Sequence, residues 1–275
     1  MSTIESEGFK VTKDLYGGMV LKTKDQSFQS ADEYDTKLAA AMPKWEADGV
    51  RGFWAKISIE HAHICSVFAK YGLDFHHAQS GYVMMAKWLP TTEPSMIPEY
   101  ANQYLGVGGF VVNERNQLLV IKEKYHPGTA QAKWKLPGGH ADKGEEIFET
   151  ARREVVEETG IETEFIGILS FRHQQNYRYG CSDFYFICVM RPINNEQEIK
   201  VCQQEIANCK WVDIDEYLDD PDITDANRYF TQCYKDSIAN GNQLIGASPV
   251  KSFNRKSTHQ VYSIHTPKPL VNKQL

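Results

Sequence analysis

The sequence predicts an α/β protein with two domains, and three observations lead to this expectation. Strand-like and helix-like runs alternate through residues 10–95 in a βαβαββ order, as in a small N-terminal α/β domain. A proline-containing stretch follows, and residues 96–103 form the expected linker. A second set of strands surrounds one acidic helix within residues 104–240, which predicts a second α/β domain, and residues 241–275 form a tail.

The elements of the N-terminal domain follow from hydrophobic periodicity and from helix-capping residues. They are, in order, a strand at 18–23, a helix at 30–48, a strand at 50–57, a helix at 60–71 and strands at 74–77 and 82–88. Ser30 is a suitable N-cap because its hydroxyl can accept from a free backbone N–H, and Gly72 suits the residue that ends a helix. Pro90, Pro94 and Pro98 then discourage regular structure, which places the domain boundary here.

The C-terminal domain opens with two strand-like runs joined by a polar turn. The expected elements are strands at 104–113 and 118–124, a loop that carries Pro127 and Gly128, a helix at 145–159, strands at 164–173 and 182–190, and a late helix at 225–240. The tail contains Ser, Lys and Pro, and we expect its end to be poorly ordered.

The composition is that of a globular protein with a well-packed core, because 41% of the residues are hydrophobic and 24% are charged. The net charge of −6 and the pI near 5.9 disfavour nucleic acid as a partner, since nonspecific binding needs a basic face. No run approaches the roughly 18 apolar residues of a membrane span, and no secretory pattern is visible at the N-terminus. The six cysteines form no CxxC pair, which favours reduced thiols and a cytoplasmic location, with mitochondrion and nucleus left open.

One helix gathers three carboxylates on one side. Glu154, Glu157 and Glu158 stand at positions i, i+3 and i+4, so they share an arc of roughly 100° and can reach the same cation. Acids at this spacing repel each other, and a bound divalent ion such as Mg²⁺, which prefers carboxylate oxygens, removes that cost. The alternative is a solvated acidic helix face without a ligand.

The flanking residues favour the ligand-binding interpretation. Arg153 can pair with Glu157 one turn later or with Glu149 one turn earlier, and so hold acids in position. The segment Pro137–Gly139 supplies a tight turn where the backbone can approach an ion or a phosphate. Gly160 suits the left-handed residue that ends the helix.

The segment GHADKGEEIFETARREVVEETGI, residues 139–161, matches the pattern G-x5-E-x7-R-E-U-x-E-E-x-G-U at every fixed position, where U is a bulky aliphatic residue. The matching residues are Gly139, Glu145, Arg153, Glu154, Val155, Glu157, Glu158, Gly160 and Ile161. This is the Nudix box, and the chain therefore resembles the Nudix hydrolase family.

The resemblance implies a C-terminal α/β/α sandwich with a mixed sheet, in which the box forms a loop, a helix and a loop. It implies that Glu154, Glu157 and Glu158 bind Mg²⁺, with Mn²⁺ as a substitute and the Gly138 carbonyl as a further ligand. Gly139, Glu145, Arg153 and Gly160 would be structural. Water would attack one phosphorus of a nucleoside diphosphate derivative.

A carboxylate must accept the proton of that water. A box glutamate, Glu157 or Glu158, is one candidate, and Glu205 from a downstream segment is the other. The alternative for Glu205 is an ordinary surface acid before a strand. Both interpretations stay open.

The first half sharpens the resemblance. RGFWAKI (residues 51–57), DFHHAQ (74–79), AKWLP (86–90) and GVGGFVVNE (106–114) are similar to a two-domain subfamily. It includes the animal fibroblast growth factor antisense protein and plant enzymes that hydrolyse ADP-ribose and NADH. The resemblance thus implies these two substrates.

Arg172, Arg178 and Tyr177 are the candidate substrate-binding residues, since they follow the box on a strand pair and could meet phosphate and base. The alternative is an exposed hairpin tip. A tyrosine at the position of Tyr177 also hints at dinucleoside polyphosphates. Trp134 could stack on an adenine, although packing beside a sheet is the commoner role of such a Trp.

Three further expectations concern the rest of the chain. His76 and His77 should face opposite sides of a strand, which favours structural roles over a metal site. The outer strand of the N-terminal domain would present an unpaired edge, which predicts a homodimer. A rival function is a regulatory protein that binds a nucleotide and acts through the N-terminal domain, with little hydrolase activity.

Overall fold

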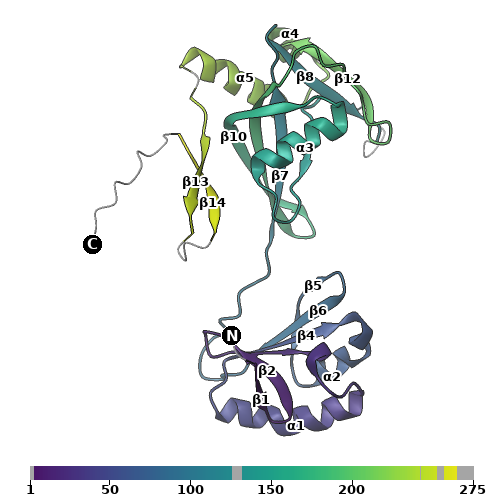
Figure 1. The fold of residues 1–275 in the computed structure, drawn as a ribbon, viewed down its shortest axis with the longest axis vertical. Helices are drawn as coiled ribbons and strands as arrows, with labels where there is room; N and C mark the ends of the chain where they lie inside the picture. Colours follow the sequence, from purple (N-terminus) through teal and green to yellow (C-terminus); the bar gives the residue numbers. More distant parts are fainter. Residues whose placement is uncertain (1–2, 126–131, 242, 253–256, 265–275) are drawn as a thin grey trace, which may run out of the picture. The chain divides into compact units, whose positions relative to one another are not determined.

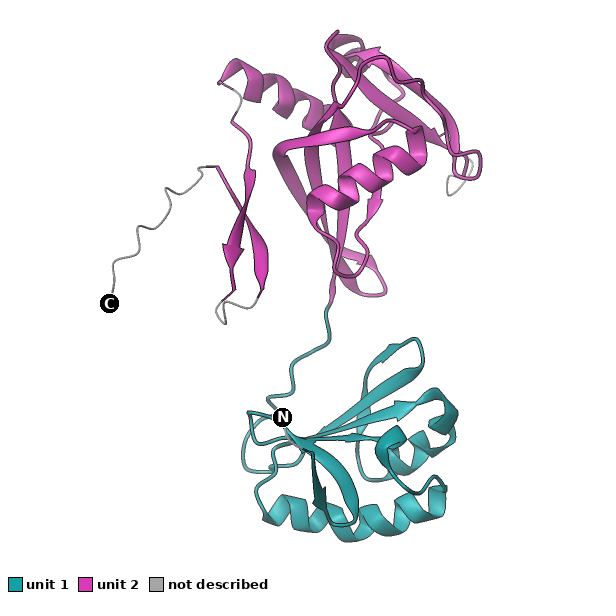
Figure 2. Ribbon diagram, viewed as in Figure 1, with its two compact units in different colours: residues 1–101 teal, residues 102–275 magenta. Residues whose placement is uncertain are grey.

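The protein divides into two compact units, residues 1–101 and 102–275 (Figure 2). We describe a computed structural model of the chain over residues 3–125, 132–241, 243–252 and 257–264. The division between the units falls inside the segment expected to be the linker. The loop that carries Pro127 and Gly128, and the end of the tail, lie outside the described residues.

Unit 1 is a six-stranded sheet with two helices. Its strands are β1 (Thr3–Ser6), β2 (Phe9–Lys13), β3 (Met19–Lys22), β4 (Gly52–Ser58), β5 (Asp74–Gln79) and β6 (Tyr82–Trp88), in the spatial order β1-β2-β3-β4-β6-β5. Only β3 and β4 pair in parallel, because helix α1 (Ala31–Ala47) connects them as a crossover. The expected α/β order is confirmed, and two short strands that we did not predict precede it.

The helices of unit 1 cover one face of this sheet and enclose an aromatic core (Figure 1). Ser30 caps α1 as predicted, since its hydroxyl accepts from the Glu33 N–H at 3.3 Å and the Glu33 carboxylate accepts from the Ser30 N–H at 3.3 Å. The predicted second helix starts late. Residues 59–64 form a 3₁₀ segment (η2), and α2 is restricted to Cys65–Lys70. The largest fully buried side chains of this core include Phe9, Tyr34, Trp45, Phe53 and Phe68.

The prediction that His76 and His77 face opposite sides of their strand is wrong. A β-bulge between Phe75 and His77 shifts the register of β5, and the two imidazoles meet with 2.7 Å between their Nδ1 atoms. His76 Nε2 lies 2.7 Å from the carbonyl oxygen of Pro98, and the ring of His77 stacks on Tyr100 at 4.5 Å. The bulge therefore holds residues 98–100, which lie in the segment expected to be the linker, against β5 within unit 1.

Unit 2 contains a mixed four-stranded sheet in the order β10-β11-β7-β9, in which β7 and β11 are parallel. A two-stranded sheet, β8 with β12, continues beside it through the bridges Val112–Leu118 and Ile121–Lys135. The elements are β7 (Gln103–Val111), β8 (Gln117–Glu123), β9 (Gly138–His140), α3 (Ile147–Thr159), β10 (Thr163–Arg178), β11 (Cys181–Pro192), β12 (Ile206–Asp213), α4 (Ile214–Asp219) and α5 (Asp225–Ala239).

Helices pack on both faces of this sheet, which confirms the expected α/β/α arrangement. On one face Val155 of α3 joins a cluster with Val107 and Val111 of β7, and Figure 1 shows α3 lying across the sheet. On the other face Phe110 meets Tyr234 of α5, with ring centroids 4.6 Å apart. Neighbouring residues of β7 therefore anchor opposite layers.

The tail contains a hairpin that we did not predict, formed by β13 (Gly246–Lys251) and β14 (Thr258–Ser263). It joins unit 2 through a bridge between Ile245 and Ile168 of β10, and Tyr262 packs against the cluster under α3. Within the described residues, no helix is long and apolar enough to cross a membrane. All six cysteines are free thiols.

Candidate active site

The acidic helix of the box is α3, and local capping residues define both of its ends. Glu146 is the N-cap, and the Glu149 carboxylate accepts from the Glu146 backbone N–H at 3.0 Å. Glu149 therefore caps the helix and does not pair with Arg153. Gly160 ends α3 with φ of +73°, as predicted, and a side chain there would meet Lys200.

Arg153 is the centre of the box. Its Nε and Nη2 donate to both oxygens of Glu145, at 2.8 and 3.0 Å. Its Nη1 donates to Glu154 at 2.8 Å and to Glu157 at 3.1 Å, and Nη2 also donates to the His140 carbonyl at 3.0 Å. The arginine thus ties the loop before α3 to the helix, and its hydrogen bonds hold the pKa of Glu145 at about 2.

The three helix carboxylates lie in different surroundings. Glu158 is buried and accepts a hydrogen bond of 2.7 Å from the Gly138 N–H, and burial raises its pKa to about 7. Burial also raises the pKa of Glu154. The Glu157 side chain is more than half exposed, at 58%. The helix therefore presents one carboxylate to solvent and holds two in a drier region.

These residues fit a divalent cation by the chemistry of their donors. The oxygens are hard ligands, and Glu154 feels the repulsion of Glu157, just as Glu158 feels that of Glu154. Gly139 leaves space that a Cβ would fill, 2.4 Å from Glu154 Oε1. Among the described residues no set of three such side chains converges on one point: Arg153 binds Glu154, and the Gly138 N–H binds Glu158.

Strand β7 passes close to both of its neighbouring layers because it carries glycines. A Cβ at Gly109 would lie 2.5 Å from Val155 of α3, and a Cβ at Gly108 would lie 2.6 Å from Oη of Tyr185. The Tyr185 ring therefore lies across β7, on the face opposite α3. The glycines of β7 therefore serve close packing against both layers.

The predicted substrate residues form two groups. Arg172 donates to the buried Asp183 at 2.8 Å and lies over the Tyr185 ring, while its own buried Nε has no hydrogen-bond partner. Tyr177 belongs to an aromatic trio with Tyr104 and His140, whose ring centroids are 5.7–6.1 Å apart.

Arg178 joins the second group, since its guanidinium lies 5.0 Å from the Tyr177 ring centroid. Four residues at these places were not predicted from the sequence: Tyr104, His140, Asp183 and Tyr185. The one local signal was Asp183, an acid inside an otherwise apolar strand that the structure buries.

Two other candidates lie apart from these contacts. Glu205 is exposed in the turn before β12, and no hydrogen bond or ion pair among the described residues links its carboxylate to the box. Trp134 is buried, and the ammonium groups of Lys122 and Lys210 lie 4.9 and 4.4 Å from its ring centroid. Its environment is that of a packing residue.

Comparisons with known proteins match both halves of the chain. A family model described as NUDIX domain matches residues 102–233, and one described as Nudix hydrolase domain matches residues 9–89. Nudix hydrolase 8 of Arabidopsis thaliana is 35% identical over 91% of this chain and 68% of its own length. Nudix hydrolase 2 of the same plant is 33% identical over 80% and 78%.

An animal relative and two solved structures also resemble the chain. The mouse protein called nucleoside diphosphate-linked moiety X motif 6 is 36% identical over 65% of this chain and 56% of its own length. The NUDIX domain of Shewanella oneidensis NrtR complexed with ADP ribose is 17% identical, with a TM-score of 0.41, over 50% of this chain and 90% of that one. A C. elegans Ap4A hydrolase is 18% identical, with a TM-score of 0.41, over 50% and 98%.

Proposed function

The chain belongs to the Nudix hydrolases, enzymes that act on diphosphate bonds, and we propose that it hydrolyses nucleoside diphosphate derivatives with Mg²⁺, ADP-ribose and NADH first among them. One observation carries this proposal. The box is intact, and a single arginine, Arg153, contacts Glu145, Glu154 and Glu157 at once. Such an arrangement keeps repelling carboxylates together, which a protein without a cation to bind has no need to do.

In this proposal Glu154, Glu157 and Glu158 hold the metal, with the Gly138 carbonyl as a further ligand and Mn²⁺ as a substitute. A bound divalent ion would supply neutralisation of phosphoryl charge and a more acidic water. The chain's own residues orient the donors. Arg153 positions Glu154 and Glu157, and the Gly138 N–H positions Glu158. Among the carboxylates, Glu157 is the one open to solvent and is our candidate base, with Glu205 as the alternative.

The aromatic trio supports a nucleotide substrate. Tyr104 meets His140 and Tyr177 edge to face, and the rings of His140 and Tyr177 are tilted by 33° to each other. We call this trio the platform, since a purine can stack on one of its rings. Arg153 donates to the His140 carbonyl, so the platform is tied directly to the box. ADP-ribose and NADH share the adenine and the diphosphate that such a site would recognise.

Arg172 is our candidate phosphate ligand. It carries a fixed positive charge, and Asp183 holds one side of its guanidinium. The Arg172 side chain is 38% exposed, so the part of its guanidinium that Asp183 does not bind can donate to a phosphate oxygen.

The test is an assay of the purified chain with Mg²⁺ or Mn²⁺ against ADP-ribose, NADH, dinucleoside polyphosphates and CoA, with product identification. We expect Glu157→Gln to lower kcat by about 100-fold or more, since it removes a charged group at the reacting centre. Glu164→Gln, which neutralises an exposed acid on β10, is the matched control and should behave as the parent. If no substrate is turned over, and Glu157→Gln binds nucleotide like the parent, the enzyme proposal fails.

A second candidate function is a nucleotide-binding regulator that acts through unit 1. The observation in its favour is that unit 1 has a complete core of its own and stands outside the box. Calorimetry separates the two functions. Tight nucleotide binding that does not depend on Mg²⁺, without product formation, would favour the regulator.

We also propose that unit 1 contributes to a homodimer, because its sheet ends in two outer strands, β1 and β5. Light scattering should then give twice the chain mass of 31.4 kDa. A monomer mass at high protein concentration would contradict this proposal.

A further inference from the structure

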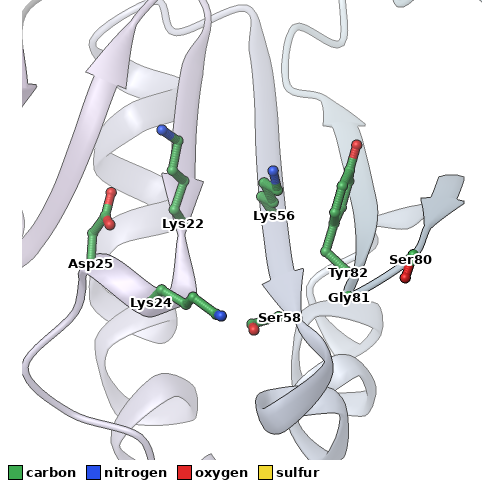
Figure 3. Close-up of a pocket in the computed structure, with 8 residues that line it drawn as sticks. All are labelled: Lys22, Lys24, Asp25, Lys56, Ser58, Ser80, Gly81 and Tyr82. Atoms are coloured by element: carbon green, nitrogen blue, oxygen red, sulfur yellow. The ribbon is translucent and has the colours of Figure 1, made fainter. Parts of the chain in front are cut away.

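Unit 1 contains a basic pocket of about 340 Å³ where β3 and β4 end and β6 begins (Figure 3). Its lining residues are Lys22, Lys24, Asp25, Lys56, Ser58, Ser80, Gly81 and Tyr82. Lys22 and Lys56 alternate along their strands with the buried Leu21 and Ile57, so their side chains point away from the helix-covered core. The pocket therefore lies on the other face of the sheet, and the box, in the other unit, does not use it.

The positive charge in this pocket is not balanced. Lys22 and Lys56 are directly opposite each other in the parallel register of β3 and β4, and like charges at such positions are destabilising. Neither has an ion pair with a carboxylate among the described residues. Lys24 pairs with the exposed Glu60 at 3.2 Å, and Asp25 is the single acid in the lining.

Neighbouring groups position the lysines around an open space. Lys56 Nζ lies 3.8 Å from the centroid of the Tyr82 ring, which holds the ammonium over an aromatic face. Figure 3 shows Lys22 and Lys56 on adjacent strands and the Lys24 ammonium turned toward Ser58. At the rim, the turn between β5 and β6 exposes Ser80, and a Cβ built on Gly81 would have no atom within 4 Å.

We propose that this pocket binds the phosphate group of a small phosphorylated molecule. Two lysines on neighbouring strands, without carboxylate partners among the described residues, match the charge of one phosphate. Hydrogen bonds between ammonium and phosphate groups are among the strong ones. The cavity is of the size that holds a small molecule. The same chemistry would accept a soluble phosphate ester or the phosphorylated headgroup of a lipid, and the test distinguishes these sources.

The test follows backbone amide resonances of the full chain during titration with pyrophosphate, without divalent metal. We expect shifts at Lys22, Lys56, Ser80 and Gly81, and the double variant Lys22→Gln/Lys56→Gln should weaken binding by about tenfold or more because two charged donors are lost. Lys13→Gln removes the same charge from β2 outside the pocket, and it should leave the affinity unchanged.

Shifts confined to residues 138–161, or equal weakening by the double variant and by Lys13→Gln, would overturn the proposal. If the double variant does not fold, Lys22→Glu alone replaces it, since Lys22 is exposed at a strand end and reversal of its charge should abolish binding. Sedimentation with phosphatidylcholine vesicles, with and without phosphatidylinositol 4-phosphate, then identifies the source. If the parent binds the phosphoinositide vesicles and the double variant does not, the ligand is a lipid headgroup. If the parent binds pyrophosphate but not the vesicles, the ligand is a soluble phosphate ester. If the parent binds neither pyrophosphate nor the vesicles, the proposed site is refuted.

Discussion

Replacing Glu145 by Gln isolates the contribution of the Arg153 centre to stability. The carboxylate accepts two hydrogen bonds from Arg153, one from the Thr150 hydroxyl at 3.0 Å and one from the Asp142 N–H at 3.0 Å. Glutamine keeps the shape and one acceptor oxygen but removes the charge. Arg153 then keeps only Glu154 and Glu157 as anionic partners.

The size of the effect follows from the pKa of Glu145. The hydrogen bonds from Arg153, and after them those from the Asp142 N–H and the Thr150 hydroxyl, lower that pKa from 4.5 to about 2. This shift corresponds to about 3 kcal/mol of favourable interaction in the folded state. The side chain is only 15% exposed, so solvent screens the pair weakly. Because glutamine still accepts one hydrogen bond, we expect the free energy of unfolding of unit 2 to fall by about 2 kcal/mol at pH 7.

The pH dependence has a definite sign. The pKa of Glu145 is lower in the folded chain than in the unfolded chain, so its contribution is complete above about pH 5. It is lost as pH falls from about 4.5 toward 2, when the folded carboxylate takes up its proton. The difference between the parent and Glu145→Gln should therefore shrink over that window and be constant from pH 5 to 7.

Pulse-labelling hydrogen exchange across a urea series measures the free energy of unfolding of unit 2, because it reports α3 peptides separately from those of unit 1. Glu164→Gln is the control in the same unit, since Glu164 and Arg191 are exposed and 3.7 Å apart and should contribute less than about 0.5 kcal/mol. The prediction is refuted if Glu145→Gln lowers the free energy of unfolding no more than the control does. It is also refuted if the stability difference between the parent and Glu145→Gln grows as pH falls.

Three further substitutions test other contacts. Gly160→Ala places a Cβ on a residue with φ of +73°, 2.8 Å from Lys200 Cβ. It should lower the free energy of unfolding of unit 2 by about 2 kcal/mol in the same exchange experiment. An unchanged stability would contradict the assigned helix cap. Gly108→Ala displaces the Tyr185 ring, 2.6 Å from the new Cβ, and should lower kcat/KM for ADP-ribose by about tenfold. Equal rates would show that this ring does not shape the site. Tyr177→Ala should raise KM for ADP-ribose by about tenfold because stacking is lost. Tyr177→Phe, which keeps the aromatic ring, is the conservative control. An unchanged KM for Tyr177→Ala would remove the platform from the proposal.

Helix α3 was predicted to within two residues because its signals are local. An apolar arc, a repeating acidic face and Gly160 all lie within one segment, and the pairing of Arg153 with Glu157 follows from helix spacing. The contacts of Arg153 with Glu145 and with the His140 carbonyl cannot be predicted from helix spacing, because they depend on the path of the loop before the helix. The metal, the base and the substrate residues stay predictions.

Other features were missed because they depend on pairing between distant strands. The pairing of β7 with β9 brings Tyr104 to His140, and the pairing of β7 with β11 brings Tyr104 to Asp183. Periodicity within one strand does not encode the register between two strands. The bulge at His76 adds one residue to a strand that otherwise alternates. The hairpin at 246–263 has no strong apolar alternation, and it is placed by a bridge to β10.

The bulge in β5 also determines where protons sit. The Pro98 carbonyl can only accept, so His76 carries its hydrogen on Nε2 and accepts at Nδ1 from the Nδ1–H of His77. His77 Nε2 then carries no hydrogen and faces the Tyr82 hydroxyl at 3.4 Å. In this arrangement the two neighbouring imidazoles are opposite tautomers. The position of one backbone carbonyl, that of Pro98, therefore determines which nitrogen of each imidazole donates and which accepts.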